Sequence, residues 1–122
     1  TDNTYKNGKG KITFDGPITE IGVDAFLGCV TLESITIPNS ATTIRNSAFY
    51  NCSGLINVNI PSSITEIGDS AFCGCSNLPS ITIPDGITTI SSSVFFECSS
   101  LTSITIPDSV TEIGTSAFLI CI

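Results

Sequence analysis

The chain has 122 residues, of which 41% are hydrophobic, and a formal net charge of −7 that comes from 11 acidic and 4 basic residues. A single domain of this length can bury a continuous core. Because the chain has no basic patch and no apolar run of about 18 residues, we do not expect it to bind nucleic acid or to insert into a membrane.

The first eleven residues differ from the rest of the chain. They hold Gly8 and Gly10 among polar residues and contain every lysine, so residues 1–11 are predicted to form a loose N-terminal leader or cap. Residues 12–122 are predicted to form an array of about five repeats, the last of which is truncated. The chain also begins without Met, has no signal-peptide pattern and stops within a repeat, which predicts a mature or excised fragment of a longer protein.

The repeat has a period of 23 residues and is marked by one phenylalanine and one cysteine per unit. These residues are Phe26, Phe49, Phe72, Phe95 and Phe118, and Cys29, Cys52, Cys75, Cys98 and Cys121. A tandem repeat of this length is typical of a solenoid, in which each unit stacks on its neighbours. We therefore expect equivalent side chains to lie over one another in columns.

Each unit begins with two predicted extended segments. Apolar and polar residues alternate toward the end of 32–37, which predicts a strand with one buried face that stops at Pro38. A second extended segment follows, with 64–67 as its clearest copy. It contains a threonine that recurs as Thr19, Thr42, Thr65, Thr88 and Thr111 and suits a parallel ladder.

The third predicted element starts at a residue that can cap a helix, namely Asp24, Ser47, Ser70, Ser93 or Ser116. The distance from this residue to the cysteine allows one turn of α- or 3-10 helix. The predicted fold class is therefore an α/β repeat solenoid, a right-handed arc of 23-residue coils. It would have a parallel strand face and a short helical outer face.

Glutamate follows the threonine column in alternate units only, in the series Glu20, Thr43, Glu66, Thr89 and Glu112. Equal charges in adjacent coils would lie about 5 Å apart and would repel each other. The alternation therefore supports the stacked register. It also favours a solvated face for these glutamates over an acid–base pair.

Five of the six cysteines occupy one repeat position beside the apolar Phe and Leu positions, where a free thiol acts as a small buried hydrophobe. We expect a reduced cysteine column. Disulfides between adjacent copies stay open as an alternative, because neighbouring coils lie within bridging distance. Cys73 is the exception and is expected to fill a partly covered apolar site on the outer face, with a reactive thiol as the alternative.

The sequence offers no catalytic constellation, metal site or cofactor motif. It has no His, which removes the commonest general base and metal ligand. Cys73 and Cys75 are too close for a zinc pair, and no second pair completes them. We therefore predict a protein that is not an enzyme, binds no metal and needs no cofactor.

The strand face is the candidate binding surface, because its outward side chains are short hydroxyls and amides at regular spacing. The candidate binding residues are Thr13, Thr36, Asn57, Asn59, Thr82 and Thr105. Small polar side chains can also serve only to make the surface of a parallel sheet compatible with water, without binding a partner. Breaks of the pattern on one face favour binding, and an even face favours a plain spacer. This face is nearly uniform, with Asn57 and Asn59 as the main change, so the spacer stays open as an alternative.

One unit of the array resembles a known repeat family. It reads Leu78-Pro79-Ser80-Ile81-Thr82-Ile83-Pro84-Asp85-Gly86-Ile87-Thr88-Thr89-Ile90, followed by Ser93-Val94-Phe95 and Cys98. This pattern is similar to the BspA-type leucine-rich repeat. The copy that ends at Cys121 follows the family pattern closely, whereas Asp15, Ala41 and Val94 depart from it.

The resemblance implies a leucine-rich-repeat arc in a surface or secreted protein of host-associated bacteria or parasitic protists. It implies adhesion to host cells or to a matrix protein such as fibronectin, with a glycan as another ligand. A structural spacer that presents another domain is the alternative function. The final coil, with Val110, Ile113 and Phe118, is predicted to leave an open edge for end-to-end self-association.

Overall fold

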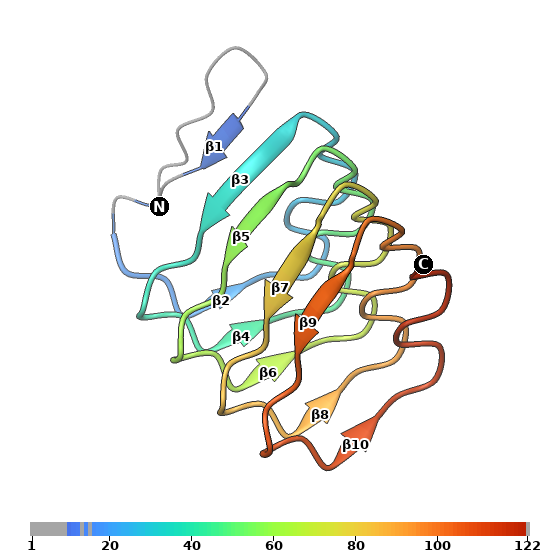
Figure 1. Cartoon of the computed structure of the whole chain (residues 1–122). Helices are drawn as coiled ribbons and strands as arrows, with labels where there is room; N and C mark the ends of the chain where they lie inside the picture. Colours follow the sequence, from blue (N-terminus) through green and yellow to red (C-terminus); the bar gives the residue numbers. More distant parts are fainter. Residues whose placement is uncertain (1–9, 13, 15, 122) are drawn as a thin grey trace.

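The computed structural model describes residues 10–12, 14 and 16–121. The chain winds into a parallel-strand β-solenoid of about 4 turns of ~23 residues (Figure 1). The first strands of successive coils lie along one side, which we call the strand face: β1 (Gly10–Ile12), β3 (Leu32–Thr36), β5 (Asn57–Asn59), β7 (Ser80–Thr82) and β9 (Ser103–Thr105). The second strands form another side: β2 (Glu20–Ile21), β4 (Thr43–Ile44), β6 (Glu66–Ile67), β8 (Thr89–Ile90) and β10 (Glu112–Ile113).

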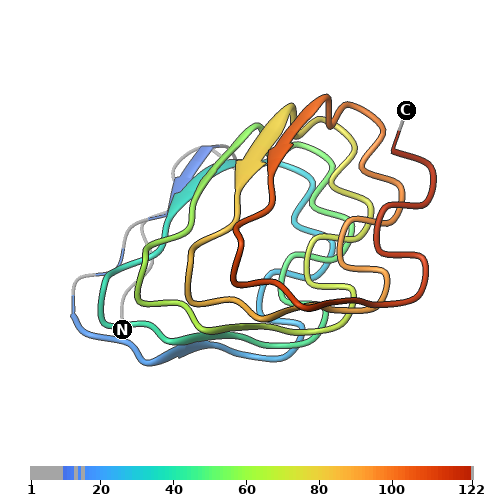
Figure 2. The same ribbon diagram turned by 60° about the horizontal axis from the view of Figure 1, so that its bottom comes forward.

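Equivalent residues of neighbouring coils lie directly over one another, as the period predicts. Ser34, Ile35 and Thr36 of β3 pair with Asn57, Val58 and Asn59 of β5, 23 positions later. The phenylalanine rings form a stacked column, with centroids 5.1 to 5.9 Å apart between successive coils. Figure 2 shows the coils as successive loops around one interior. The predicted columns are confirmed.

The core consists of the inward side chains of both strands and of the Phe, Cys and Leu columns. Phe49, Phe72, Leu55 and Leu78 are fully buried, as are Cys52 and Cys75. Each large apolar side chain contributes about 1.5–3 kcal/mol when it leaves water. Because neighbouring coils bury one another's columns, the stabilisation comes from stacking rather than from any coil alone.

The third side of each coil contains no helix in the part of the chain that the structure describes, so the predicted helical outer face is wrong. The residues expected to cap helices adopt left-handed backbone conformations, with φ of 56 to 59° at Asp24, Ser47, Ser70, Ser93 and Ser116. A helix N-cap instead has extended backbone geometry. The segment is therefore a series of turns, and we call it the turn side.

Backbone hydrogen bonds explain why turns replace the helix. The Tyr50 N–H donates to the Ser47 carbonyl at 3.1 Å within its own coil, whereas the Phe49 N–H donates to the Ala71 carbonyl of the next coil at 2.8 Å. The same alternation recurs from coil to coil. Each second N–H is thus committed to the neighbouring coil and is lost to the i→i−4 bonds of an α-helix.

The second strands confirm the alternation of charge. Glu20 pairs with Thr43, Thr43 pairs with Glu66, and Glu112 pairs with Thr89. The exposed Arg45 reaches back to Glu20 with a guanidinium–carboxylate distance of 2.8 Å. No two glutamates therefore lie in adjacent coils among the described pairs, which avoids repulsion at close range.

The six cysteines are free in the structure, and five of them form the predicted column. The thiols of Cys52, Cys75, Cys98 and Cys121 each donate to the carbonyl oxygen of the phenylalanine 26 residues earlier, at 2.8 to 3.3 Å. Burial raises the pKa of Cys52 and of Cys98 to about 12 and raises that of Cys75 further.

Cys73, which lies outside this column, is also buried, at 5% exposure, so it does not sit in a partly covered site. Burial, followed by the charge of Glu97, raises its pKa and makes its thiol a poor nucleophile.

Candidate binding groove on the strand face

The strand face brings most of the sequence-predicted binding residues together. Thr36, Asn57, Asn59, Thr82 and Thr105 are all exposed on the outward side of their strands. Thr36 pairs with Asn59 in the ladder, and Thr82 pairs with Thr105. Thr13 lies outside the described residues. The sequence pattern therefore identifies one continuous face, although the geometry along that face is not uniform.

The sheet of the strand face is interrupted between β5 and β7. Its strands form two separate ladders, β1-β3-β5 and β7-β9. At the equivalent position in other coils, the Ile56 N–H donates to the Glu33 carbonyl at 2.9 Å and the Thr102 N–H donates to the Pro79 carbonyl at 3.0 Å. Pro79 has no N–H and cannot make this bond to Ile56. One residue thus accounts for a missing bond at the start of the interruption.

The interruption leaves backbone polar groups facing the gap. In a parallel ladder the N–H and C=O of one residue point to the same neighbouring strand, and those of the next residue point to the opposite one. The Asn59 carbonyl accepts from the Ile37 N–H, so Asn59 faces β3 and the Val58 peptide groups face β7. Val58 therefore presents its N–H and C=O to the gap, without a ladder partner.

A hollow of about 380 Å³ opens at this place, lined by Ile56, Asn57, Val58, Asn59, Ile60, Ser80, Ile81 and Thr82. We call it the seam groove. Val58 takes the position that Ile35 and Ile81 fill in neighbouring coils. Ile56 is 53% exposed. Val58 and Ile60 are half-buried, whereas the equivalent residues of the neighbouring coils are buried: Ile35 and Ile81 for Val58, and Ile37 and Ile83 for Ile60. The groove thus combines an apolar wall with amide and hydroxyl groups.

The chemistry of the seam groove suits recognition. Its lining has no charged, thiol or imidazole side chain, so it offers no general base, nucleophile or metal ligand. Asn57 and Asn59 each present an amide donor and acceptor, and Ser80 and Thr82 add hydroxyls. Such a site can hydrogen-bond a neutral polar surface, such as peptide groups or sugar hydroxyls.

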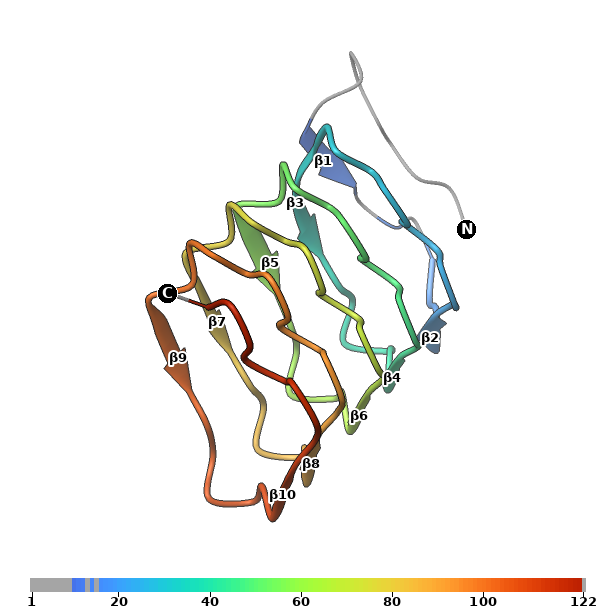
Figure 3. The same ribbon diagram turned by 90° about the vertical axis from the view of Figure 1, so that its right-hand side faces the viewer.

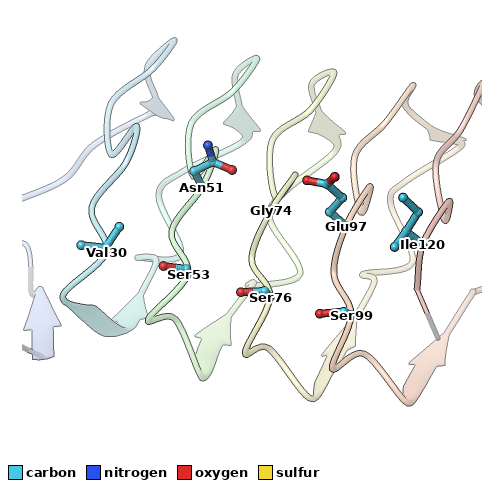
Figure 4. Close-up of a pocket in the computed structure, with 8 residues that line it drawn as sticks. All are labelled: Val30, Asn51, Ser53, Gly74, Ser76, Glu97, Ser99 and Ile120. Carbon is cyan, nitrogen blue, oxygen red and sulfur yellow. The ribbon is translucent and has the colours of Figure 1, made fainter.

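A second hollow of about 550 Å³ runs along the turn side across several coils. Figure 4 shows that Ser53, Ser76 and Ser99 line up along it, with Gly74 and Glu97 in the neighbouring column. The sequence analysis missed it. Its only sequence signal is the serine that directly follows three of the cysteines. We treat this turn-side groove as a comparison surface for the experiments below.

Two searches of the described residues bear on other functions. No cluster of three or more His, Cys, Asp or Glu side chains in this part of the chain has the arrangement of a metal site. These residues also form no helix that is long and apolar enough to cross a membrane.

Comparisons with known proteins agree with the repeat pattern. The family model of the BspA type leucine rich repeat region matches residues 2–122, with 6 copies. A leucine-rich repeat protein from T. pallidum is 34% identical, with a TM-score of 0.87 over 96% of this chain and 57% of its own. One from Bacteroides ovatus is 32% identical, with a TM-score of 0.73 over 93% of this chain and 35% of its own.

A leucine-rich cell surface protein from Faecalibacterium prausnitzii is 28% identical, with a TM-score of 0.62 over 97% of this chain and 46% of its own. The chain therefore spans about half of the T. pallidum protein and less of the other two. A search of curated proteins found no match.

Proposed function

Because this chain belongs to the BspA-type leucine-rich repeat family, we propose that it is a protein-binding module of a cell-surface or secreted protein and adheres to a host matrix protein through the seam groove. The family is generally non-enzymatic and indicates a protein-interaction module. Surface location is supported by one relative, the cell surface protein from Faecalibacterium prausnitzii.

The observation that carries the proposal is the interruption of the strand face at Pro79. A spacer needs only a repeating surface, and a break in its sheet would weaken it. Here the break coincides with Asn57 and Asn59, which replace the usual hydroxyl residues, and both asparagines line one hollow beside it. A partner protein that offers peptide or side-chain amides there can use both the apolar wall and the polar rim.

The groove is tested by the triple variant Asn57→Lys, Asn59→Lys and Thr82→Lys. Long charged side chains fill the hollow and oppose the burial of a neutral partner surface. We expect attachment to fibronectin-coated surfaces and to cultured epithelial cells to fall at least about tenfold, equivalent to ~1.4 kcal/mol. The melting temperature should change little, because all three side chains are exposed.

The matched control carries the same number of lysines elsewhere on the face, as Thr36→Lys, Ser103→Lys and Thr105→Lys. It should attach like the unaltered protein. If the groove variant attaches normally, the groove is not the binding site. If the unaltered protein attaches to neither surface, adhesion is wrong and the spacer function takes its place.

A further inference from the structure

The interruption at Pro79 is one part of a larger discontinuity, because the second sheet breaks between the same two coils. Its strands form the ladders β2-β4-β6 and β8-β10. In the other coils, Thr42, Thr65 and Thr111 donate backbone N–H groups to the threonine carbonyl one coil earlier, at 2.8 to 2.9 Å. No such bond joins Thr88 to Thr65 in the described residues.

Side-chain bonds change at the same boundary. Ser40 and Ser109 donate hydroxyls to the Ile18 and Ile87 carbonyls of the preceding coil, at 2.6 and 2.7 Å. The other two residues of this column make no such bond: the Ser63 hydroxyl has no hydrogen-bond partner, and Gly86 at the boundary has no hydroxyl for the Ile64 carbonyl. The Ile67 carbonyl accepts from the Ser91 hydroxyl at 2.5 Å. In other coils the equivalent carbonyl accepts from a backbone N–H.

The turn side is continuous across this boundary. The Ser70, Phe72 and Gly74 N–H groups donate to the carbonyls of Ser92, Val94 and Phe96, at 3.0, 3.0 and 2.8 Å. The Asp69 carboxylate also accepts from the Ser92 N–H at 3.1 Å. Three backbone bonds therefore join the two coils along one side, whereas neither strand side has a ladder.

The spacing of the phenylalanine column is also widest here. The ring centroids of Phe72 and Phe95 lie 5.9 Å apart, compared with 5.1 to 5.6 Å for the other pairs in the column. Val94 takes the position of the alanine found in the other four copies, which adds volume at the boundary. Aromatic stacking and dispersion both weaken as surfaces separate.

From these observations we propose that the solenoid is hinged between residues 10–78 and 79–121 and opens along its strand sides on the microsecond to millisecond timescale. The turn-side bonds form the axis of the hinge, along the side that faces the viewer in Figure 3. Each stack moves as a rigid unit because its own ladders are intact. Opening widens the seam groove. The effect of this widening on ligand binding rests on the proposed function, whereas the hinge motion itself does not.

Methyl relaxation-dispersion NMR of the ligand-free chain tests the hinge. We expect exchange broadening at Val58, Ile60, Ile81 and Ile83, which flank the boundary, and flat profiles at the column equivalents Ile35 and Ile37 within the first stack. The variant with Pro79→Thr and Gly86→Ser restores the residues of neighbouring coils at both positions. A Cβ at Gly86 would lie 3.3 Å from the Ile64 carbonyl oxygen and 3.3 Å from the Thr65 Cγ2 atom. Both contacts are tight and require a small local shift, and they place a serine hydroxyl within reach of the Ile64 carbonyl.

In this variant we expect the broadening at the boundary to disappear. Flat profiles at all six residues of the unaltered chain would overturn the proposal. Equal broadening at Ile35 and Ile37 would overturn it too, since the whole array would then breathe without a hinge. The measurement uses no ligand, so its failure leaves the attachment experiment standing, and failed attachment leaves the hinge standing.

Discussion

The substitution Phe72→Ala is expected to lower the free energy of unfolding by about 3–5 kcal/mol, through lost burial and the cavity it leaves. Phe72 is fully buried and stacks on two rings, those of Phe49 at 5.1 Å and Phe95 at 5.9 Å. It also sits beside the boundary where both ladders are missing, so the two stacks are held together by the core columns and the turn-side bonds. Chemical denaturation followed by circular dichroism measures the loss.

Phe118→Ala is the matched control for this prediction. Phe118 is only partly buried and stacks on one ring, that of Phe95 at 5.6 Å. We expect it to cost clearly less than Phe72→Ala, because less surface returns to water. An equal cost for both substitutions would show that the phenylalanine column does not gain its stability from stacking on both sides.

The protein is expected to unfold cooperatively in alkali between pH 9 and 12, because three thiols in its core cannot ionise while it is folded. Burial raises the pKa of Cys52 and of Cys98 from 9.0 to about 12, and also raises that of Cys75. In the unfolded chain these thiols ionise near their ordinary value. Their contribution to stability is therefore complete below pH 9 and is lost as the pH rises toward the folded values.

Each thiol contributes a slope of about −1.4 kcal/mol per pH unit in this range, so three thiols give about −4 kcal/mol per unit. A domain with a total stability of roughly 5–15 kcal/mol then unfolds within a few pH units. The measurement is denaturant unfolding in reducing buffer from pH 7 to 11. Cys29, Cys73 and Cys121, whose pKa values burial also raises, add to this slope, whereas the chain has only two tyrosines and its lysines all lie in the first eleven residues.

The variant with Cys52→Ala, Cys75→Ala and Cys98→Ala separates this effect from general alkaline damage. It starts from lower stability because of the cavities, and its free energy of unfolding should fall less steeply above pH 9, since only Cys29, Cys73 and Cys121 still have raised pKa values. A slope as steep as that of the unaltered protein would show that the buried thiols do not cause the alkaline transition.

The period of 23 residues was sufficient to predict the columns, because identical positions in identical coils must stack in register. Phe49 over Phe72 and Cys52 over Cys75 follow directly. The helical side could not be predicted correctly, because a serine before Ala-Phe fits two local conformations. A serine such as Ser70 can act as a helix N-cap or can adopt a left-handed turn conformation. Which of the two forms depends on hydrogen bonds to the next coil, and the sequence of a single unit does not show these bonds.

The candidate site could be predicted in part. The change to Asn57 and Asn59 is visible in the sequence and marks the place where the groove lies. Pro79 was also visible, in a position that holds Glu33, Ile56 and Thr102 in other units. Its effect depends on knowing that the N–H at this position bonds to the preceding coil, and only the structure gives that contact.

Hydrogen–deuterium exchange of this protein with and without fibronectin tests the central claim most directly, because it maps the contact surface without any substitution. We predict slower exchange on binding in the peptides that cover residues 55–61 and 78–83, which form the seam groove. Exchange at the turn-side groove, in residues 51–53, 74–76 and 97–99, should not change. Protection there instead, or no protection anywhere, would contradict a binding site on the strand face.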